Sequence, residues 1–366
     1  MKIKLIEPVA VSLPLTKPVK MAGVEIRNAD NVLVRIESSD GLVGWGESAS
    51  APIMTGETVE SMVAAVKHLA PYLEGEFEDI GTAVRTMNKW MYGNSSAKGA
   101  IEIALHDLLG RATSQPAYAL LGGKRRDRIA TLRMISSGKL DADIAEARAS
   151  LAAGFVAFKV KVGVSTPEAD AERTRRVCET LGRGVLICAD ANQGYTVDEA
   201  LRYVKAVGDA GLDFFEQPIV QDDLDGMARI AASTRIAIGA DEGVHSLEHI
   251  RRHHERKAAK GVSLKTIKLA GLRGVMEAGR LCAELGMEVN VACKIAESSI
   301  ASAAVTHVAA ALPSINWSVS LTCQYLAADV TRTPLQVVQG RVAVSDAPGL
   351  GVEVDEGLVR RYQVKI

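Results

Sequence analysis

The sequence predicts a mixed α/β protein in which a parallel β/α barrel accompanies a smaller α+β domain. Residues 1–128 place strand-like segments before helical ones, whereas residues 129–330 alternate short apolar runs with amphipathic stretches. Such alternation is typical of βαβ units, which form a parallel sheet with right-handed crossovers. In addition, polar residues end successive apolar runs at nearly even steps of 29, 26, 25 and 24 residues.

The first part of the chain begins with segments of strand character. A Ser-Asp-Gly turn at 39–41 separates two of them, as in a hairpin. Segments with apolar residues at helical spacing follow, and strands before helices indicate an α+β domain. The predicted strands are Lys2–Val11, Asn31–Ser38 and Leu42–Gly46, and the predicted helices are Thr58–Leu73, Ile80–Met91 and Ser96–Ala112.

The second part favours a barrel over a doubly wound sheet. A doubly wound sheet uses only a few strand ends at its switch point, whereas a barrel turns every strand's carboxyl end towards one mouth. Here five successive strand ends carry chemically active residues, namely Lys161, Asp190, Glu216, Asp241 and Lys265. The predicted strands are Phe155–Val162, Val185–Ala189, Phe214–Phe215, Ile236–Ala240, Leu264–Ile267 and Val289–Val291, and the predicted helices include Ala142–Ala153, Ala169–Leu181, Val197–Ala210 and Arg273–Leu285.

The tail after about Val330 returns to strand-like sequence punctuated by glycines, as in Gly340-Arg-Val-Ala-Val-Ser. No long low-complexity linker separates the two parts, so we expect the first domain to pack on the barrel. We therefore predict residues 1–128 as the N-terminal part of the α+β domain and residues 129–330 as the barrel. Residues 331–366 are expected to complete the first domain.

Composition and charge exclude several classes of protein. Hydrophobic residues make up 48% and charged residues 24% of the 366 residues, as in an ordinary globular protein. A formal net charge of −1 provides no basic field for nucleic acid. The N-terminal stretch contains Glu7 and Pro8, unlike a signal peptide, and no run of about 18 apolar residues predicts a membrane span. The five cysteines form no CxxC pair, which indicates free thiols in the cytoplasm.

Asp190, Glu216 and Asp241 are candidate metal ligands. Each follows a buried-strand pattern, where a carboxylate without a partner is costly. Three carboxylates at one mouth repel one another unless a cation neutralises them, and all-oxygen ligands favour Mg²⁺, with Mn²⁺ as the alternative. The competing interpretation is that each acid caps the next helix or pairs with a lysine. Asn192 either supports the metal site or forms a turn, and Glu242 is equally ambiguous.

Lysines at the strand ends are candidate proton-transfer residues. Lys159 and Lys161 lie two residues apart in one strand, so both are expected to point into the barrel. Crowding by other cations lowers the pKa of a lysine and makes it a usable base near neutral pH. On the far side Lys265 keeps the strand-end spacing, whereas Lys268 falls in the following loop and is expected to be a solvated surface lysine.

These residues and several further motifs resemble the muconate-lactonizing-enzyme subgroup of the enolase superfamily. The resemblance covers almost the whole chain, and the combination of motifs is highly specific. The matching motifs are Lys159-Val-Lys161, the Asp190/Glu216/Asp241 series, Lys265, Gly44-Trp-Gly-Glu-Ser, Ala97-Lys-Gly-Ala-Ile-Glu-Ile-Ala-Leu-His-Asp, Leu121-Gly-Gly and Pro348-Gly-Leu-Gly.

The resemblance implies a modified TIM barrel of the (β/α)7β type, capped by an α+β domain to which both chain ends contribute. It implies Mg²⁺ on the three acids and abstraction of a proton alpha to a carboxylate through an ene-diolate, whose charge the metal stabilises. Lys161 and Lys265 would act as acid and base from opposite faces of the substrate, and Lys159 would tune Lys161. The histidine base of the mandelate-racemase branch has no counterpart in Val289–Lys294. A homo-oligomer is also implied.

Substrate specificity is implied to come from two capping loops, about Thr16–Asn28 and Ser48–Glu57, and from the last strand ends. Two methionines are candidates for apolar walls, and a lysine near the seventh strand end is a candidate contact for a substrate carboxylate. The candidate substrate-binding or supporting residues are Met21, Met54, Asn192, Lys294 and Glu297.

The last strand departs from two known patterns. The run from Asn316 to Gln324 lacks the glutamate that muconate cycloisomerases carry shortly after the tryptophan, and it lacks the Asp-x-Asp of dipeptide epimerases. Cycloisomerisation of cis,cis-muconate is the nominal function, and racemisation, epimerisation or dehydration of another carboxylic acid is the alternative. A non-catalytic binding barrel is disfavoured by the full lysine set, and a Schiff-base aldolase by the three acids. The expected partner is a small carboxylate, with no nucleic acid and no membrane.

Overall fold

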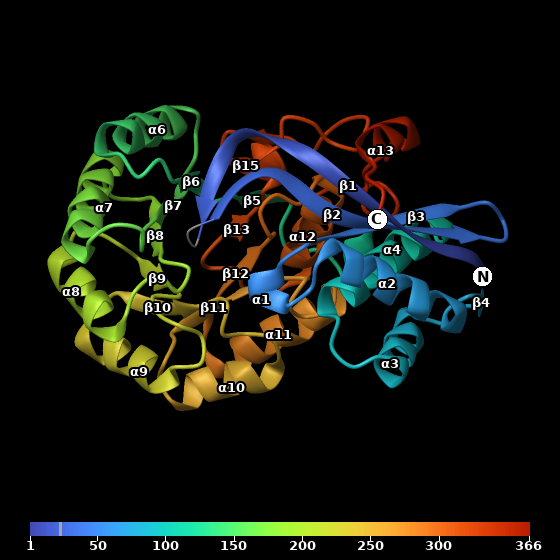
Figure 1. Cartoon of the computed structure of the whole chain (residues 1–366), viewed down its shortest axis with the longest axis horizontal. Helices are drawn as coiled ribbons and strands as arrows, with labels where there is room; N and C mark the ends of the chain where they lie inside the picture. The colour runs from blue at the N-terminus through green and yellow to red at the C-terminus, as the bar shows by residue number, and fades with distance from the viewer. Residues whose placement is uncertain (22–23) are drawn as a thin grey trace.

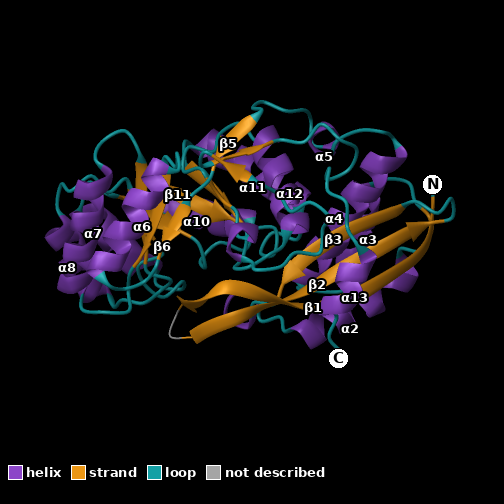
Figure 2. Ribbon diagram, turned by 90° about the horizontal axis from the view of Figure 1, so that it is seen from above, coloured by secondary structure: helices purple, strands orange, loops and turns teal. Residues whose placement is uncertain are grey.

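The computed structural model describes residues 1–21 and 24–366 and consists of two parts that lie side by side (Figure 1). One part is a four-stranded antiparallel sheet in the order β3-β2-β1-β4, with helices packed against it (Figure 2). The other part is an eight-stranded parallel sheet surrounded by helices (Figure 1). This mixed α/β architecture confirms the predicted fold class.

The antiparallel part holds its own apolar core because its strands alternate. Val32, Val34 and Ile36 face one side of β2 and are fully buried against residues of the covering helices such as Met62 and Leu105. The elements are β1 (Lys2–Met21), β2 (Val24–Ser38), β3 (Val43–Ala49), β4 (Gly75–Glu76), α1 (Pro52–Thr55), α2 (Val59–Leu69), α3 (Ile80–Trp90), α4 (Ser95–Ala112) and α5 (Ala117–Leu120).

The stretch predicted as a loop over residues 16–28 is strand in its described part, residues 16–21 and 24–28. In the structure β1 and β2 continue as a hairpin that still pairs at Met21 and Val24, beyond a register shift between Pro14 and Val19. The polar sequence of this stretch lacks the alternation that marks a half-buried strand, because the hairpin leaves the sheet and extends towards the barrel (Figure 1). At the barrel, a bridge joins Leu15 to Leu326.

The parallel sheet is a barrel of the (β/α)7β type, as predicted. Its strands follow chain order from β6 to β13, and a parallel bridge between Thr131 and Val319 joins its two ends. The strands are β6 (Arg133–Ile135), β7 (Ala157–Lys161), β8 (Leu186–Asp190), β9 (Phe214–Glu216), β10 (Ala237–Ala240), β11 (Gly261–Leu264), β12 (Glu288–Ala292) and β13 (Val319–Ser320). The helices between them are α6 (Leu140–Ala152), α7 (Pro167–Leu181), α8 (Val197–Val207), α9 (Leu224–Ser233), α10 (Leu247–Glu255), α11 (Leu272–Leu285) and α12 (Ser299–Ala311).

The predicted bounds of one strand were wrong by several residues. The expected strand Leu264–Ile267 is β11, which ends at Leu264, and the residues after Lys265 form a turn. The apolar residues of this turn, Ile267 and Leu269, are buried like strand residues, which explains the error.

The C-terminal segment contacts both parts of the molecule. β14 (Val337–Val338) and β15 (Arg341–Ala343) form a small antiparallel sheet with β5 (Arg128–Ala130). The chain then returns to the antiparallel part, where α13 (Glu356–Tyr362) is followed by a hydrogen bond from the Val364 N–H to the Ala10 carbonyl, 3.0 Å.

Buried carboxylates of the antiparallel part cap two barrel helices. Glu102 on α4 accepts hydrogen bonds from the backbone N–H groups of Leu272 (2.8 Å) and Arg273 (3.0 Å), at the start of α11. Glu47 on β3 accepts from the N–H groups of Ser298 (2.8 Å) and Ala301 (3.0 Å), at the start of α12. Helix N-termini carry partial positive charge and free N–H donors, so these contacts fix one part of the molecule on the other.

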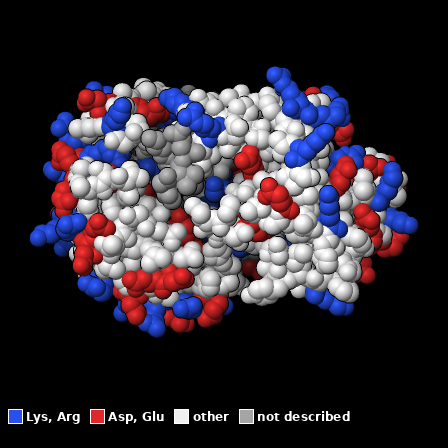
Figure 3. Space-filling model, in the orientation of Figure 1, with Lys and Arg blue, Asp and Glu red and all other residues white. Residues whose placement is uncertain are grey.

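The surface charge and the cysteines of the structure correspond to what the composition predicted. On the face that Figure 3 shows, acidic and basic side chains are interspersed over both parts. All five cysteines are buried and none forms a disulfide with another described residue. Within the described ranges, the structure contains no helix with the length and apolarity needed to span a bilayer.

Replacing Glu102 with glutamine tests the helix-capping contact. Glutamine keeps one acceptor but turns an NH₂ group towards an N–H donor, so we expect the free energy of unfolding to fall by about 2 kcal/mol. Urea unfolding of Glu102→Gln measures the loss, and Glu277→Gln on the exposed face of α11 is the control. Equal stability of the two variants would contradict the capping role.

Candidate active site

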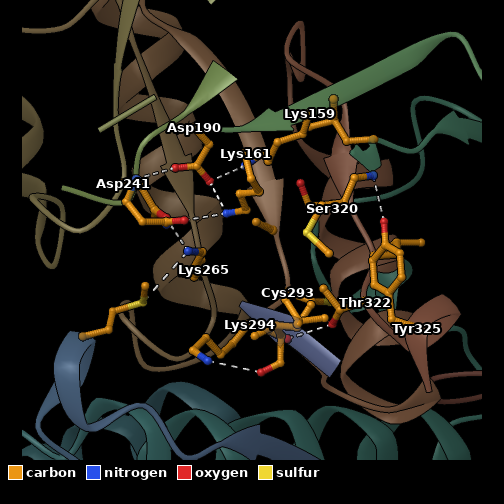
Figure 4. A pocket seen from close by; sticks show the side chains of 18 residues that line it. Lys159, Lys161, Asp190, Asp241, Lys265, Cys293, Lys294, Ser320, Thr322 and Tyr325 are labelled. Atoms are coloured by element: carbon orange, nitrogen blue, oxygen red, sulfur yellow. Dashed lines mark hydrogen bonds and ion pairs between the residues drawn. The ribbon is translucent and has the colours of Figure 1, made fainter. Parts of the chain in front are cut away.

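The lysines and carboxylates predicted at the strand ends meet at one mouth of the barrel (Figure 4). The parallel register brings them together, because it places Lys161 on β7 opposite Asp190 on β8, and Asp190 opposite Glu216 on β9. Asp241 and Lys265 directly follow β10 and β11. Even spacing along the chain has therefore become proximity in space, as a barrel requires.

Each carboxylate of this cluster is bonded to an ammonium group. The Lys159 Nζ lies 2.7 Å from Glu216 Oε2, and the Lys161 Nζ lies 2.6 Å from Asp190 Oδ2. Lys265 donates to Asp241 Oδ2 on the other side of the cluster. Both lysines of β7 therefore point into the barrel, as their period of two predicted.

Burial and the ammonium groups act in opposite directions on the three acids. Burial alone would raise the pKa of Asp190, but Lys161 and Lys159 outweigh it and hold that pKa below its usual value. Lys265 similarly lowers the pKa of Asp241. For Glu216 burial prevails and the pKa is raised. Two of the acids are thus held as carboxylates by their lysines.

The expected lowering of the lysine pKa values is not seen in this arrangement. Burial acts in the expected direction on Lys159 and Lys265, but the surrounding carboxylates outweigh it and raise both pKa values. The nearest charges to these amines are anions rather than cations. A cation bound to the same carboxylates would weaken that attraction and lower the pKa of both lysines.

The prediction for Lys268 is wrong, because this side chain is completely buried at 0% exposure. The turn after β11 folds back on itself, and the Lys268 Nζ donates to Asp241 Oδ1 at 2.7 Å and to the Ser263 carbonyl at 3.1 Å. Asp241 is therefore held by two ammonium groups, one on each oxygen. Sequence spacing placed Lys268 outside the strand but could not show which way the turn directs its side chain.

Gln217 is a supporting residue that the sequence analysis missed. Its Oε1 accepts hydrogen bonds from the backbone N–H groups of Asp241 (2.8 Å) and Gly243 (3.2 Å), and its Nε2 donates to the Ile219 carbonyl (3.0 Å). These bonds fix the backbone that carries Asp241. The available signal was a polar residue directly after the strand-end Glu216.

Asn192 forms a turn and also joins the cluster. It has a positive φ of 42°, its Oδ1 accepts from the Lys161 Nζ at 2.6 Å, and its Nδ2 donates to Glu242 Oε1 at 3.1 Å. Burial and the neighbouring Asp241 raise the pKa of Glu242 to about 7. Asn192 thus links Lys161 to Glu242, a fourth carboxyl group beside the cluster.

A cavity that is partly open to solvent adjoins the cluster. Its apolar walls come from the barrel and from the hairpin and α1 of the antiparallel part, and they include Met54, whose Sδ lies 3.9 Å from the Lys265 Nζ. The predicted contact of Met21 falls on a side chain outside the described part of the chain. Apolar walls around a few charged and polar groups are typical of a small-molecule site.

The seventh and eighth strand ends form the far wall of the cavity. Lys294, Ser320 and Thr322 line it, so the end of the last strand is neutral and polar, as the sequence indicates. Glu297 is fully buried behind this wall, where its oxygens accept from the N–H groups of Ala49 (3.3 Å) and Lys294 (2.9 Å). It supports the wall rather than lining the cavity.

The donor chemistry of the cluster fits a hard cation such as Mg²⁺. Glu216 Oε1 is buried and, among the described residues, has no hydrogen-bond partner, which leaves a lone pair free for a metal. Within residues 1–21 and 24–366 no group of three acidic, His or Cys side chains forms a ready set of ligands. Lysine ammonium groups lie between the carboxylates, so a cation would replace them as the counter-charge.

Comparisons with known proteins match nearly the whole chain. The N-terminal domain model of the mandelate racemase / muconate lactonizing enzyme family matches residues 5–122, and the enolase C-terminal domain-like model matches residues 142–358. The N-succinyl-L-Arg/Lys racemase of Bacillus cereus is 31% identical over 100% of this chain and 98% of its own. The L-Ala-D/L-Glu epimerase of Bacillus subtilis is 31% identical over 96% and 97%. The crystal structure of 2-chloromuconate cycloisomerase from Rhodococcus opacus superposes with a TM-score of 0.95 at 31% identity, covering 100% of both chains.

Replacing Lys268 with methionine tests whether this buried ammonium group balances Asp241. The variant keeps the chain length but leaves one carboxylate oxygen without its charged partner. We expect it to lose about 3 to 5 kcal/mol of unfolding free energy in EDTA-containing buffer, measured by urea unfolding. The exposed Lys260, directly before β11, provides the control variant Lys260→Met. A loss no larger than that of the control would show that Asp241 does not need Lys268.

Proposed function

Because the chain belongs to the muconate-lactonizing-enzyme subgroup of the enolase superfamily, we propose that it removes or adds a proton alpha to a substrate carboxylate with a pair of lysines beside a Mg²⁺ site. The observation that carries the proposal is the placement of Lys161 on β7 and Lys265 directly after β11, the two strands that flank the carboxylate-bearing strands β8, β9 and β10 in the barrel. Proton transfer from either face of a bound acid requires such an arrangement.

In this proposal Asp190, Glu216 and Asp241 hold the metal. The ion, when bound, supplies fixed positive charge beside the substrate carboxylate, where the charge of the ene-diolate develops. Mn²⁺ is the alternative ion, because it accepts the same oxygen ligands.

The lysines move the proton. Lys161 and Lys265 each reach the cavity, and each takes or gives the proton on its own face of the substrate. Lys159 lies beside both Asp190 and Glu216, two residues from Lys161 on the same strand, and in this proposal it tunes Lys161. Asn192 fixes the Lys161 amine by accepting its N–H at 2.6 Å.

The nominal net reaction is cycloisomerisation of the muconate type. Racemisation or epimerisation, or dehydration of another carboxylic acid, is the second candidate, because two opposed lysines serve these reactions equally well. Two observations favour retaining this second candidate reaction. Relatives of both kinds match the chain equally well, and Ser320 and Thr322 make the last strand end neutral.

A library of carboxylic acids in D₂O with Mg²⁺ tests the proposal. ¹H NMR detects exchange of the α-proton for deuterium, and it also detects cyclised or dehydrated products. If no acid exchanges, cyclises or dehydrates, the proposed function is wrong. Reductive trapping with borohydride separates the proposal from Schiff-base chemistry, which would leave a covalent adduct on lysine.

Removing either lysine should abolish net turnover. We expect Lys161→Ala and Lys265→Ala each to lower the rate by roughly 10²- to 10⁴-fold, because each removes a positioned acid or base. In a racemase each variant should still exchange the α-proton of one enantiomer, whereas a cycloisomerase has no such pair of exchange reactions. Lys205→Ala on the exposed face of α8 is the matched control. Undiminished turnover in either variant would remove that lysine from the mechanism.

Removing a proposed ligand should weaken metal binding independently of turnover. We expect Asp190→Asn to raise the Kd for Mg²⁺ by more than the roughly 10- to 100-fold typical of residues behind the ligands. Isothermal calorimetry measures the change, and the exposed Asp198→Asn on α8 is the control. An unchanged Kd would rule out Asp190 as a ligand.

Three further expectations complete the proposal. We expect a homo-oligomer in the cytoplasm, as the family resemblance implies. We also expect residues 331–366 to complete the domain that residues 1–128 begin, with residues 129–330 as the catalytic barrel.

A further inference from the structure

A group of buried charged side chains lies behind the strand end that carries Lys161. Arg173 on α7 is only 5% exposed, and its guanidinium donates to Asp143 Oδ2 at 2.6 Å and to Asp170 Oδ1 at 2.9 Å. Both acids are also buried. Charges in such a place are costly unless each has a partner, and here one guanidinium serves two carboxylates. The described lining of the cavity includes none of these three acid and arginine side chains.

Arg173 also contacts the backbone of Lys161. Its Nη2 donates to the Lys161 carbonyl at 2.5 Å. The pairing of β7 with β6 ends one residue earlier, where Val160 lies opposite Ile135. A guanidinium carries five N–H donors in one plane, so it can bond two carboxylates and a carbonyl at the same time. Arg173 therefore holds the strand at the residue where its pairing with β6 has ended.

Asp170 holds the chain on the other side of Lys161. Its Oδ2 accepts from the backbone N–H groups of Gly163 (2.9 Å) and Ser165 (3.4 Å), in the turn between β7 and α7. The Tyr195 hydroxyl donates to the same oxygen at 2.8 Å. Burial and Asp170 both raise the pKa of Tyr195, so this hydroxyl stays protonated and remains a donor. The chain is thus bonded to the same buried group at Lys161 and again two residues later.

These residues, which we call the Arg173 network, are Arg173, Asp143, Asp170 and Tyr195. Asp143 Oδ1 accepts from the N–H (2.9 Å) and the hydroxyl (2.6 Å) of Ser137, in the loop after β6, and Tyr195 lies in the loop after β8. The strands β6, β7 and β8 are neighbours in the barrel (Figure 1). The network therefore fixes the end of β7 from both sides. The second lysine of the proposed pair follows β11, beyond the carboxylate-bearing strands.

We propose that Arg173 is a positioning residue for Lys161, which it holds through the Lys161 carbonyl and, with Asp170, through the Gly163 N–H. This inference rests on the proposed function in taking Lys161 and Lys265 as the two proton-transfer residues. A displacement of about 1 Å in a reacting group costs roughly 10²-fold in rate. Because the network holds only one of the two lysines, its disturbance slows proton transfer on only one face of the substrate.

Arg173→Lys tests the proposal, with each face of the substrate as the control for the other. Lysine keeps the positive charge between the two carboxylates but loses the planar fork that also reaches the carbonyl. We expect exchange of the α-hydrogen on the face that Lys161→Ala abolishes to slow roughly 10- to 100-fold, and exchange on the opposite face to stay within about twofold of wild type. KM should not change, because Arg173 does not line the cavity.

Both rates are measured by ¹H NMR in D₂O with Mg²⁺. An acid with one α-hydrogen is supplied as each enantiomer in turn, and an acid with two is followed at its two prochiral hydrogens. A ratio of the two rates that stays at the wild-type value in Arg173→Lys, whether both rates fall or neither does, would contradict the positioning role and leave the network a purely structural one.

A second network variant and a control on the same helix complete the experiment. Tyr195→Phe removes one hydroxyl donor and keeps every charge, so it should slow the same face by less than Arg173→Lys does. It decides the question by the same ratio if Arg173→Lys does not fold. Arg175→Lys lies on the exposed side of α7, where Arg175 pairs with Glu172 at 3.1 Å, and should leave both faces unchanged.

A measurement without substrate separates this proposal from the proposed function. Absence of α-proton exchange for every acid would overturn the proposed function. The Lys161 amine, held by Asn192 at 2.6 Å, can still be followed by reductive methylation in EDTA-containing buffer, with each lysine quantified by mass spectrometry. We expect Arg173→Lys to speed modification of Lys161 several-fold and to leave that of Lys265 unchanged. Equal rates at Lys161 in the variant and the wild type would overturn the positioning role.

Discussion

At the carboxyl ends of β8, β9 and β10, three carboxylates lie almost completely buried, and each alone would carry a large desolvation cost. Lysines from β7 and from the turn after β11 meet this cost by placing ammonium groups on every one of them. The balance stabilises the buried acids with the chain's own charges. In the proposed function a divalent cation would replace part of this lysine charge and leave the amines that it displaces free for proton transfer.

The same use of charge holds the two parts of the molecule together. Glu47 and Glu102 belong to the antiparallel part, yet their oxygens accept from the first N–H groups of α12 and α11. Burial raises the pKa of Glu47 to about 7 even though it accepts several hydrogen bonds. Because the cavity walls come from both parts, these contacts also fix the position of Met54 relative to the lysines.

Sequence patterns predicted features that depend on short, regular spacing. The strand-end residues lie about one βα unit apart, and the two lysines of β7 lie two residues apart, so their placement follows from geometry common to all barrels. Other features depend on contacts that spacing does not encode. Glu102 meets α11 across 170 residues of chain. Lys268 lies in the turn after β11, where its N–H donates to the Lys265 carbonyl (3.2 Å) and its amine reaches Asp241 Oδ1 (2.7 Å).

Lys268 and Lys294 are two buried lysines whose ammonium groups have different surroundings. Both are buried lysines in the turns that follow neighbouring strands, β11 and β12, and burial lowers the pKa of both. Lys268 pairs with Asp241, so the two buried charges neutralise each other within the chain. Lys294 donates to a backbone carbonyl, and among the described residues no ion pair joins it to a carboxylate, although Glu297 lies close behind it. The desolvation cost of the Lys268 ammonium group is offset by Asp241, whereas that of Lys294 has no such counter-charge within ion-pair distance among the described residues.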